Sequence, residues 1–166
     1  NDTVGGAIYQ DGDLYLGDNY KSGKIGHMIV VPGGRKCYCG KRGCLDSYCS
    51  AKALRRDESD RSLSGFFEDL ENGDPACVKR WDMYLDYLAV VVSNLRMALD
   101  CDIVLGGQVG GYMEGHMRSF SDKIREYNNF EVDTSYISLG KSKWECAPIG
   151  AARMMIDNYL VNLEVE

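Results

Sequence analysis

The sequence predicts an α/β domain with a mixed sheet flanked by helices, and three observations lead to that fold class. The chain opens with strand-like runs around the turn dipeptide Asp11-Gly12. One long amphipathic helix follows in the middle of the chain, and short apolar runs then alternate with helical segments. A chain of 166 residues can bury a substantial core, so we expect one domain over residues 1–166.

The first quarter of the chain predicts strands and then a loop. Residues 3–9 and 14–16 flank Asp11-Gly12 and predict a hairpin, and the run 27–31 predicts a third strand. Residues 32–44 are dense in glycine, cysteine and basic side chains and predict a loop. Residues 45–56 are typical of a helix.

A long helix is the clearest element of the sequence. Asp74-Pro75 is a strong helix start, because Asp favours the N-cap and Pro favours the first helical position. Apolar residues then recur at steps of three and four, which predicts a helix buried along one side: Val78, Trp81, Leu85, Leu88, Val92, Leu95 and Leu99. Helical spacing also marks the region 59–73.

The second half alternates between the two kinds of element. Residues 101–105 predict a buried strand that ends at Gly106-Gly107, and residues 136–139 predict another. Helices are expected over 112–127 and 148–160, and the latter offers small and apolar side chains for packing: Ala151, Ala152, Met155 and Leu160.

Composition excludes several classes of protein for this chain. A net charge of −6 argues against a phosphate backbone as partner, since nucleic-acid footprints are basic. No apolar run is long enough to span a bilayer and no export signal opens the chain, so we expect a cytoplasmic protein that does not engage membranes. The first residue is Asn1 rather than Met, and we expect a fragment of a longer protein.

A zinc site is the most specific prediction of the sequence. His27, Cys37, Cys39 and Cys44 form the pattern H-x9-C-x-C-x4-C, and three thiolates with one imidazole suit tetrahedral zinc. Four protein ligands close the coordination shell, which indicates a structural Zn²⁺ that pins the loop 32–44. The alternative is reduced cysteines in a surface loop, which would be prone to oxidation.

Basic residues flank this cluster and could offset the thiolate charge: Arg35, Lys36, Lys41 and Arg42. The remaining cysteines are scattered and are interpreted as small buried hydrophobic residues: Cys49, Cys77, Cys101 and Cys146.

The zinc segment resembles the signature of the ROK family, named for repressors, open reading frames and sugar kinases. Here it reads G-K-I-G-H at 23–27 and C-Y-C-G-K-R-G-C-L-D at 37–46, where the family has G-E-I-G-H and C-x-C-G-x-x-G-C-L-E. Three further segments resemble the family over nearly the whole chain: V-G-G-A-I at 4–8, I-V-L-G-G at 103–107 and P-I-G-A-A at 148–152.

The resemblance implies the actin-like, ribonuclease-H-like fold, with this chain as its C-terminal lobe. It implies the same zinc ligands and a sugar site beside them, at the positions of Lys24, His27 and Asp46. His27 can bind zinc through one ring nitrogen and donate to a sugar hydroxyl through the other. Asp46 could instead be a first-turn acid of the following helix, and Lys24 a solvated loop lysine.

Three departures from the family pattern bear on function. Asp2 stands in the segment where the kinases carry a phosphate-binding turn, Lys24 replaces a sugar-binding Glu, and Gln108 replaces a third glycine near the adenosine. A lysine cannot accept hydrogen bonds from hydroxyls, so the ligand could be a sugar phosphate or sugar acid.

These departures favour the sugar-sensing lobe of a ROK transcriptional regulator. The alternative is the C-terminal lobe of a glucokinase-like or N-acetylhexosamine-kinase-like enzyme, with ATP and Mg²⁺ as cofactors and with Gly106 and Gly107 at the nucleotide. A third hypothesis is a degenerate lobe that serves dimer formation only. The resemblance also implies a homodimer, and contact with DNA only through an N-terminal domain that this chain lacks.

No residue of the chain is assigned a catalytic role. In the family kinases the general base and the first phosphate loop belong to the N-terminal lobe, and phosphoryl transfer depends on such positioning groups. We therefore expect these 166 residues to be inactive as a kinase on their own.

Overall fold

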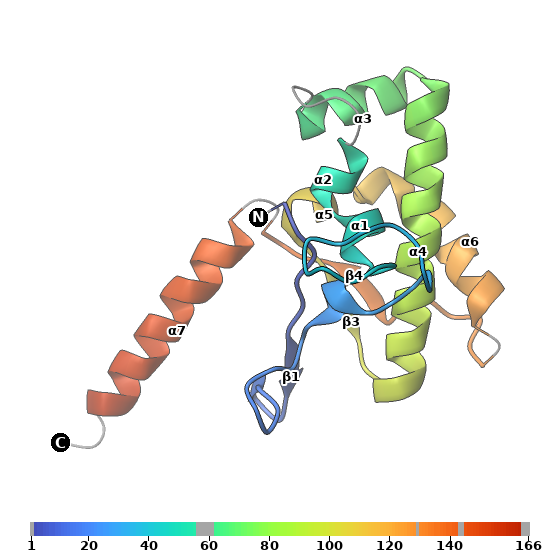
Figure 1. Cartoon of the computed structure of the whole chain (residues 1–166). Helices are drawn as coiled ribbons and strands as arrows, with labels where there is room; N and C mark the ends of the chain where they lie inside the picture. Colours follow the sequence, from blue (N-terminus) through green and yellow to red (C-terminus); the bar gives the residue numbers. More distant parts are fainter. Residues whose placement is uncertain (1, 56–61, 129, 143–144, 164–166) are drawn as a thin grey trace.

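The computed structural model describes residues 2–55, 62–128, 130–142 and 145–163 (Figure 1). The described residues form helices and two small sheets: β1 (Ile8–Gln10) pairs antiparallel with β2 (Asp13–Tyr15), and β3 (Ile103–Leu105) pairs parallel with β4 (Ile137–Leu139). The predicted α/β class with both strand directions is confirmed. The strands form two separate pairs within the described residues rather than one continuous sheet.

The hairpin is present and its turn explains its sequence. Tyr9 pairs with Leu14, and both turn residues adopt positive φ, 54° at Asp11 and 88° at Gly12. Asp-Gly tolerates these angles, which match the twist of the flanking strands. The first strand begins at residue 8 rather than at residue 3, so the prediction was right in kind but too long.

The predicted third strand at 27–31 is wrong. The short 3-10 helix η1 (Ile25–His27) occupies its start, and only Ile29 forms a single antiparallel bridge, with Cys44. The amides of Val30 and Val31 both donate to the carbonyl of Gly43, because the loop 32–44 folds back on this segment. The apolar run 27–31 therefore hydrogen-bonds to the loop 32–44 instead of extending a sheet.

The predicted helix at 45–56 is two short helices, α1 (Asp46–Cys49) and α2 (Ala51–Leu54). Ser50 separates them with extended backbone, φ −89° and ψ 158°, and its hydroxyl accepts from the amide of Ala53 at 3.1 Å. Serine favours this N-cap role. Residue 56, where we expected the end of this helix, lies outside the described residues.

The long helix α4 (Pro75–Leu99) confirms the sequence prediction at both its start and its length. The carboxylate of Asp74 accepts from the amide of Cys77 at 2.9 Å, as an N-cap should. Val78 and Leu99, at the two ends of the expected stripe, are exposed, so the buried part of the stripe is shorter than predicted. Before it, α3 (Leu63–Glu71) fulfils the helical pattern of 59–73, of which residues 59–61 lie outside the described residues.

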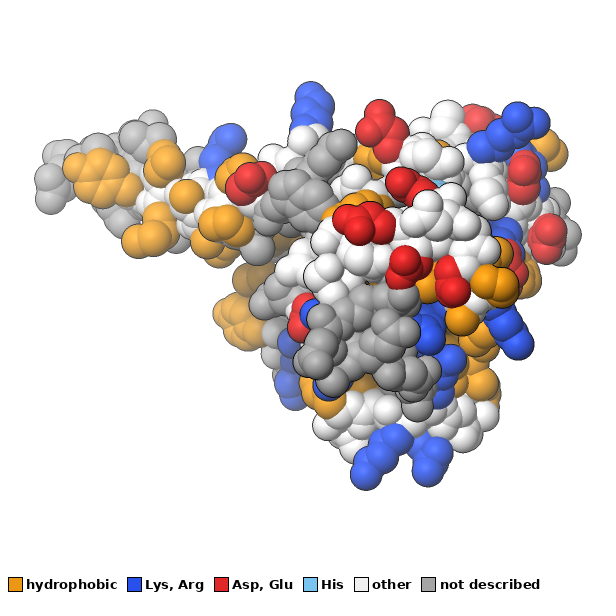
Figure 2. Space-filling model, turned by 90° about the horizontal axis from the view of Figure 1, so that it is seen from above, with side chains coloured by type: hydrophobic (Ala, Val, Ile, Leu, Met, Phe, Trp, Pro, Cys, Tyr) orange, Lys and Arg blue, Asp and Glu red, His pale blue; other side chains and the backbone are white. Residues whose placement is uncertain are grey.

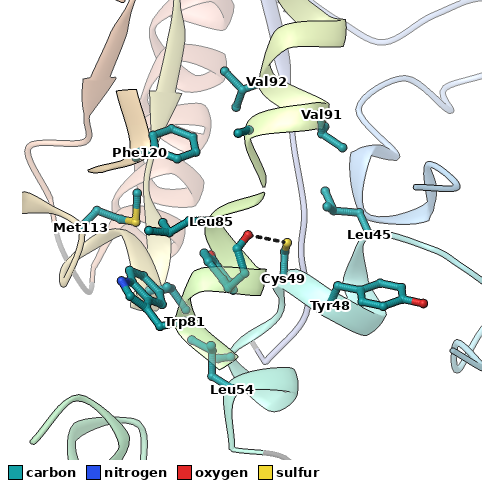
Figure 3. Close-up of a cluster of buried hydrophobic side chains, with 14 of the residues drawn as sticks. Leu45, Tyr48, Cys49, Leu54, Trp81, Leu85, Val91, Val92, Met113 and Phe120 are labelled. Carbon is teal, nitrogen blue, oxygen red and sulfur yellow. Dashed lines mark hydrogen bonds between the residues drawn. The ribbon is translucent and has the colours of Figure 1, made fainter. Parts of the chain in front are cut away.

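The hydrophobic core is built around α4, which runs the length of the body (Figure 1). Figure 3 shows Met113 and Phe120 on one side of α4 and Leu45 and Cys49 on the other. The Cys49 thiol donates to the carbonyl of Tyr84, in α4, at 3.4 Å. Cys49 and Cys77 are buried as predicted, whereas Cys101 is only half-buried and Cys146 has no described side chain.

The helix expected at 112–127 begins later. A 3-10 turn, η2 (Glu114–His116), precedes α6 (Met117–Tyr127), and a short helix that we did not expect, α5 (Gly107–Gly110), follows β3 directly. The last helix, α7 (Cys146–Leu163), begins two residues before the predicted start.

Helix α7 projects away from the body (Figure 1), and apolar side chains are exposed along it (Figure 2). Ala151, Ala152 and Met155 are exposed, and the side chain of Leu160 lies outside the described part. Among the described residues, no helix is both long and apolar enough to cross a membrane.

His116 should make stability depend on pH. Its ring contacts Trp81 edge-on at 5.0 Å between centroids, and burial lowers the pKa of His116 although Glu71 partly opposes the shift. Below about pH 6.5, His116 therefore binds a proton more readily in the unfolded chain than in the folded one. The free energy of unfolding falls as the pH drops from that value.

Urea unfolding of the wild type and of His116→Gln at pH 7.5 and pH 5 measures this effect. We expect the wild type to lose more stability on acidification than the variant, and groups shared by the two proteins cancel in this comparison. Equal losses in both proteins would contradict the assignment to His116.

Candidate metal centre and ligand site

His27 and three cysteines converge in one cluster. Their donor atoms all lie within 4.8 Å of one another: His27, Cys37, Cys39 and Cys44. Cys39 Sγ is 3.7 Å from Cys44 Sγ, and Cys37 Sγ is 3.8 Å from His27 Nδ1. Sulfur atoms held at about 2.3 Å by one tetrahedral zinc lie about 3.8 Å apart, so the spacing and the donor types fit this ion.

The backbone of the loop shapes this cluster. The amide of Cys37 donates to the carbonyl of Lys41 at 2.8 Å, and the amide of Gly40 donates back to Cys37 at 3.0 Å. Gly43 has φ 86°, and a Cβ there would overlap the carbonyl oxygen of Val31. Only glycine allows the chain to pass this point and deliver Cys44 to the cluster.

Burial argues against the alternative of surface thiols. Cys37 and Cys44 are 3% and 1% exposed, and only Cys39 faces solvent. Burial raises the pKa of Cys44 to about 12, while a hydrogen bond from the backbone amide of Lys41 lowers the pKa of Cys39. A metal cation bound in place of the thiol protons would balance the negative charge of the buried thiolates.

The neighbouring arginines donate to backbone carbonyls. Arg35 donates to the carbonyl of Ser47 at 3.2 Å, and Arg42 donates to the carbonyl of Gly34 at 3.1 Å. Lys36 and Lys41 are exposed. The expectation that these basic groups offset the thiolate charge stays a prediction.

The second nitrogen of His27 has a partner that the sequence did not indicate. Tyr38, the residue between the first two cysteines, places its hydroxyl 3.2 Å from His27 Nε2, and the two rings meet edge-on at 5.3 Å. Nδ1 thus faces the metal cluster while Nε2 faces outward. This is the division of roles expected of a histidine that serves both zinc and a ligand.

Asp46 is buried at the first turn of α1, which matches the first-turn alternative. Its carboxylate accepts from the amide of Val4 at 2.6 Å, so it ties the N-terminal segment to the loop. The amide of Leu45 donates to the carbonyl of Met28 at 2.8 Å, which brings Asp46 close to the segment of His27. Lys24 is exposed and makes no side-chain cap on η1, as expected of a solvated lysine.

Gly106 and Gly107 line a hollow of about 880 Å³ together with residues 3–9, the apolar side of α4, and Gln108. Gly107 opens α5 with φ 76°, a conformation that glycine adopts readily. The carboxylate of Asp2 pairs with Arg55 at 2.7 Å, an interaction that was not predicted from the sequence. This pairing offsets the negative charge of Asp2, which stands in the segment where the family kinases carry a phosphate-binding turn.

The chain is similar to curated sugar kinases. It is 36% identical over 123 residues to an N-acetylmannosamine kinase of Vibrio cholerae, a match that covers 67% of this chain and 42% of the kinase. An N-acetylmannosamine kinase of Yersinia pestis is 34% identical over 119 residues, again with 67% of this chain and 41% of the relative. The matched segment is thus less than half of either relative.

Solved structures of the same family share the fold. A ROK hexokinase from Thermus thermophilus superposes with a TM-score of 0.77 at 26% identity, over 87% of this chain and 52% of that one. A ROK transcriptional regulator, a homologue of the E. coli MLC protein, superposes with a TM-score of 0.68 at 21% identity, over 83% and 39%. The fold is therefore the actin-like one that the resemblance implied. The model of the ROK family matches residues 3–158, and the chain belongs to that family.

Proposed function

We propose that this chain is the C-terminal lobe of an ATP-dependent sugar kinase that acts on an N-acylhexosamine and carries one structural zinc. The observation that carries this proposal is the 36% identity to an N-acetylmannosamine kinase. It reverses the preference for a regulator, which rested on three substituted positions. One of these, Asp2, is paired with Arg55.

The zinc would be held by His27, Cys37, Cys39 and Cys44, whose four donors leave no open position on the ion. Its contribution is to fix the loop and the orientation of the His27 ring. With Nδ1 committed to the metal, Nε2 carries the proton and donates to a sugar hydroxyl. Asp46 and Lys24 stay proposed sugar-site residues, Asp46 acting through its hold on Val4 and Lys24 from the exposed side of η1.

The nucleotide would lie along the large hollow beside Gly106 and Gly107. Absence of side chains at these positions lets a phosphate or ribose approach the backbone closely. Mg²⁺ would accompany the ATP phosphates, as in phosphoryl transfer generally. No residue of this chain is proposed as the general base, so the 166 residues alone are expected to be inactive.

The regulator stays a second candidate because of two side chains. Lys24 stands at a sugar-contact position without any hydrogen-bond acceptor, and Gln108 lines the proposed nucleotide hollow. A sensor needs sugar binding but no phosphate chemistry. In that case the partner would be a sugar or sugar phosphate, with DNA bound through a separate domain and a homodimer as the working unit.

An assay of the full-length protein tests the proposal. ADP release is measured with ATP, Mg²⁺ and N-acetylmannosamine, with glucose as the comparison sugar. We expect turnover that is faster with N-acetylmannosamine. Thermal stabilisation by a sugar without any ADP release would instead favour the regulator, because a ligand of the native state stabilises it without chemistry.

Removing the Tyr38 hydroxyl should strengthen sugar binding if His27 is a sugar donor. In the free protein this hydroxyl lies against His27 Nε2, so a sugar has to displace it. A neutral hydrogen bond contributes about 0.5–1.5 kcal/mol, so Tyr38→Phe should lower the KM for the sugar by roughly 2- to 10-fold. The kcat should change little.

Tyr20→Phe is the matched control for this test, because Tyr20 is 80% exposed on the hairpin side of the chain. A higher KM in Tyr38→Phe, with Tyr20→Phe unchanged, would show that the hydroxyl contacts the sugar rather than competing with it.

A further inference from the structure

A second, smaller hollow lies between the metal loop (residues 32–44), α1 and the first half of α4. Its volume is about 230 Å³, and its walls carry basic, aromatic and apolar side chains: Arg35, Tyr48, Ala76, Lys79, Arg80, Met83 and Tyr87. None of these lining residues is acidic, although the chain as a whole has a net charge of −6. The described walls of the hollow are therefore positively charged, unlike the chain as a whole, and favour an anion.

Two of the three basic groups are held in place by backbone carbonyls. Arg35 donates to the carbonyl of Ser47 at 3.2 Å, and its guanidinium lies 4.6 Å from the centre of the Tyr48 ring. Arg80 donates through Nη1 to the carbonyl of Leu54 at 2.8 Å. Arg35 has more donors than its bond to Ser47 uses, and a guanidinium that is already oriented loses little entropy when it binds an anion.

Lys79 is the third basic residue of the hollow and lies on its exposed side. Its ammonium forms no ion pair with any residue in the described ranges. Ala76 belongs to the first turn of α4, so the positive end of the helix dipole also lies at the wall of the hollow.

The remaining wall is aromatic. Tyr48 and Tyr87 pack at 4.4 Å between ring centres, and Met83 lies beside them. Figure 3 shows the Tyr48 ring directed away from the core side chains of α4. The Tyr48 hydroxyl accepts from the amide of Arg35 at 2.8 Å, which leaves its own proton free to donate.

We propose that this hollow binds a phosphomonoester dianion, with the phosphate between Arg35, Lys79 and Arg80 and an attached sugar ring against the tyrosines. Its volume is below the roughly 300–1,000 Å³ of pockets for drug-sized ligands, which fits a sugar phosphate better than a nucleotide. The site shares no lining residue with the hollow at Gly106 and Gly107, so the inference does not depend on the proposed kinase activity.

Amide NMR titration of the full-length protein tests this site, with inorganic phosphate, glucose 6-phosphate and glucose as the three probes. Phosphate and glucose 6-phosphate should shift the amides of Tyr48, Ala76, Lys79 and Arg80 in a saturable way, and glucose should not. Tighter binding of glucose 6-phosphate identifies a sugar phosphate as the ligand, and equal binding identifies phosphate alone.

Lys79→Glu is the decisive variant, because Lys79 is exposed and its loss leaves the core untouched. We expect the Kd for glucose 6-phosphate to rise at least 10-fold. Lys21→Glu changes the net charge equally at an exposed residue outside the hollow, and it should change the Kd less than 2-fold.

Three results would overturn the proposal: no saturable shifts, shifts confined to the amides of Gly106 and Gly107, or an equal loss of affinity in both lysine variants. An absence of sugar-kinase turnover would bear on the proposed function alone, because these titrations contain no ATP.

Discussion

Cys39→Ser is expected to lower the free energy of unfolding by about 4 kcal/mol, because the loss of a metal is one of the few mechanisms that give so large an effect. Cys39 is the exposed cysteine of the cluster, so the substitution creates no cavity and buries no new polar group. The loop 32–44 contributes few residues to the core apart from its cysteines. A large effect at an exposed position would therefore have to come from the loss of the ion.

Cys101→Ser supplies the matched control, since Cys101 is a half-buried cysteine away from the cluster. Metal content is measured by mass spectrometry of the native protein and stability by urea unfolding. We expect one zinc per chain in the wild type and in Cys101→Ser, and a loss of zinc together with stability in Cys39→Ser. A stable Cys39→Ser protein without zinc would show that the cluster is not a structural metal site.

The metal cluster could be predicted from sequence because its information is local. Its ligands lie within eighteen residues, and their chemistry is distinctive even without the fold. The strand predicted at 27–31 failed for the opposite reason. Its apolar run is typical of a strand, but the partner that decides its conformation is the carbonyl of Gly43, which belongs to an irregular loop.

Helix α4 was predictable in full because each signal agrees: an Asp N-cap, a proline at the first position and a continuous apolar stripe. The break at Ser50 between α1 and α2 was missed although serine is a known N-cap, because no apolar repeat changes there. Local capping chemistry was thus informative where the helix was long and was overlooked where it was short.

The details of the candidate ligand site required the structure. The sequence indicated His27 and Asp46, but not that Tyr38 would lie against the outer nitrogen of His27 or that Asp46 would hold Val4. The basic hollow joins Arg35 to Lys79 and Arg80 across more than forty residues of chain. No periodicity or motif marks such a grouping, because it depends on how the metal loop packs against α4.

Phe120→Ala should lower the free energy of unfolding by about 3–5 kcal/mol, the usual cost of removing a buried aromatic ring. Phe120 is fully buried, and it joins α6 to the core that forms around α4 (Figure 3). The loss would combine the lost burial of the ring with the cavity that remains, because the packed helices α4 and α6 cannot collapse fully into the space.

Phe130→Ala removes the same side chain at a position that is 85% exposed, so it separates burial from the chemistry of the substitution. Urea unfolding should place Phe130→Ala within about 0.5 kcal/mol of the wild type, as is usual for surface changes. Similar losses in the two variants would mean that α6 is not packed as the structure shows. A selective loss at Phe120 would instead support the packing of α6 on α4, the same helix whose first half forms one wall of the basic hollow.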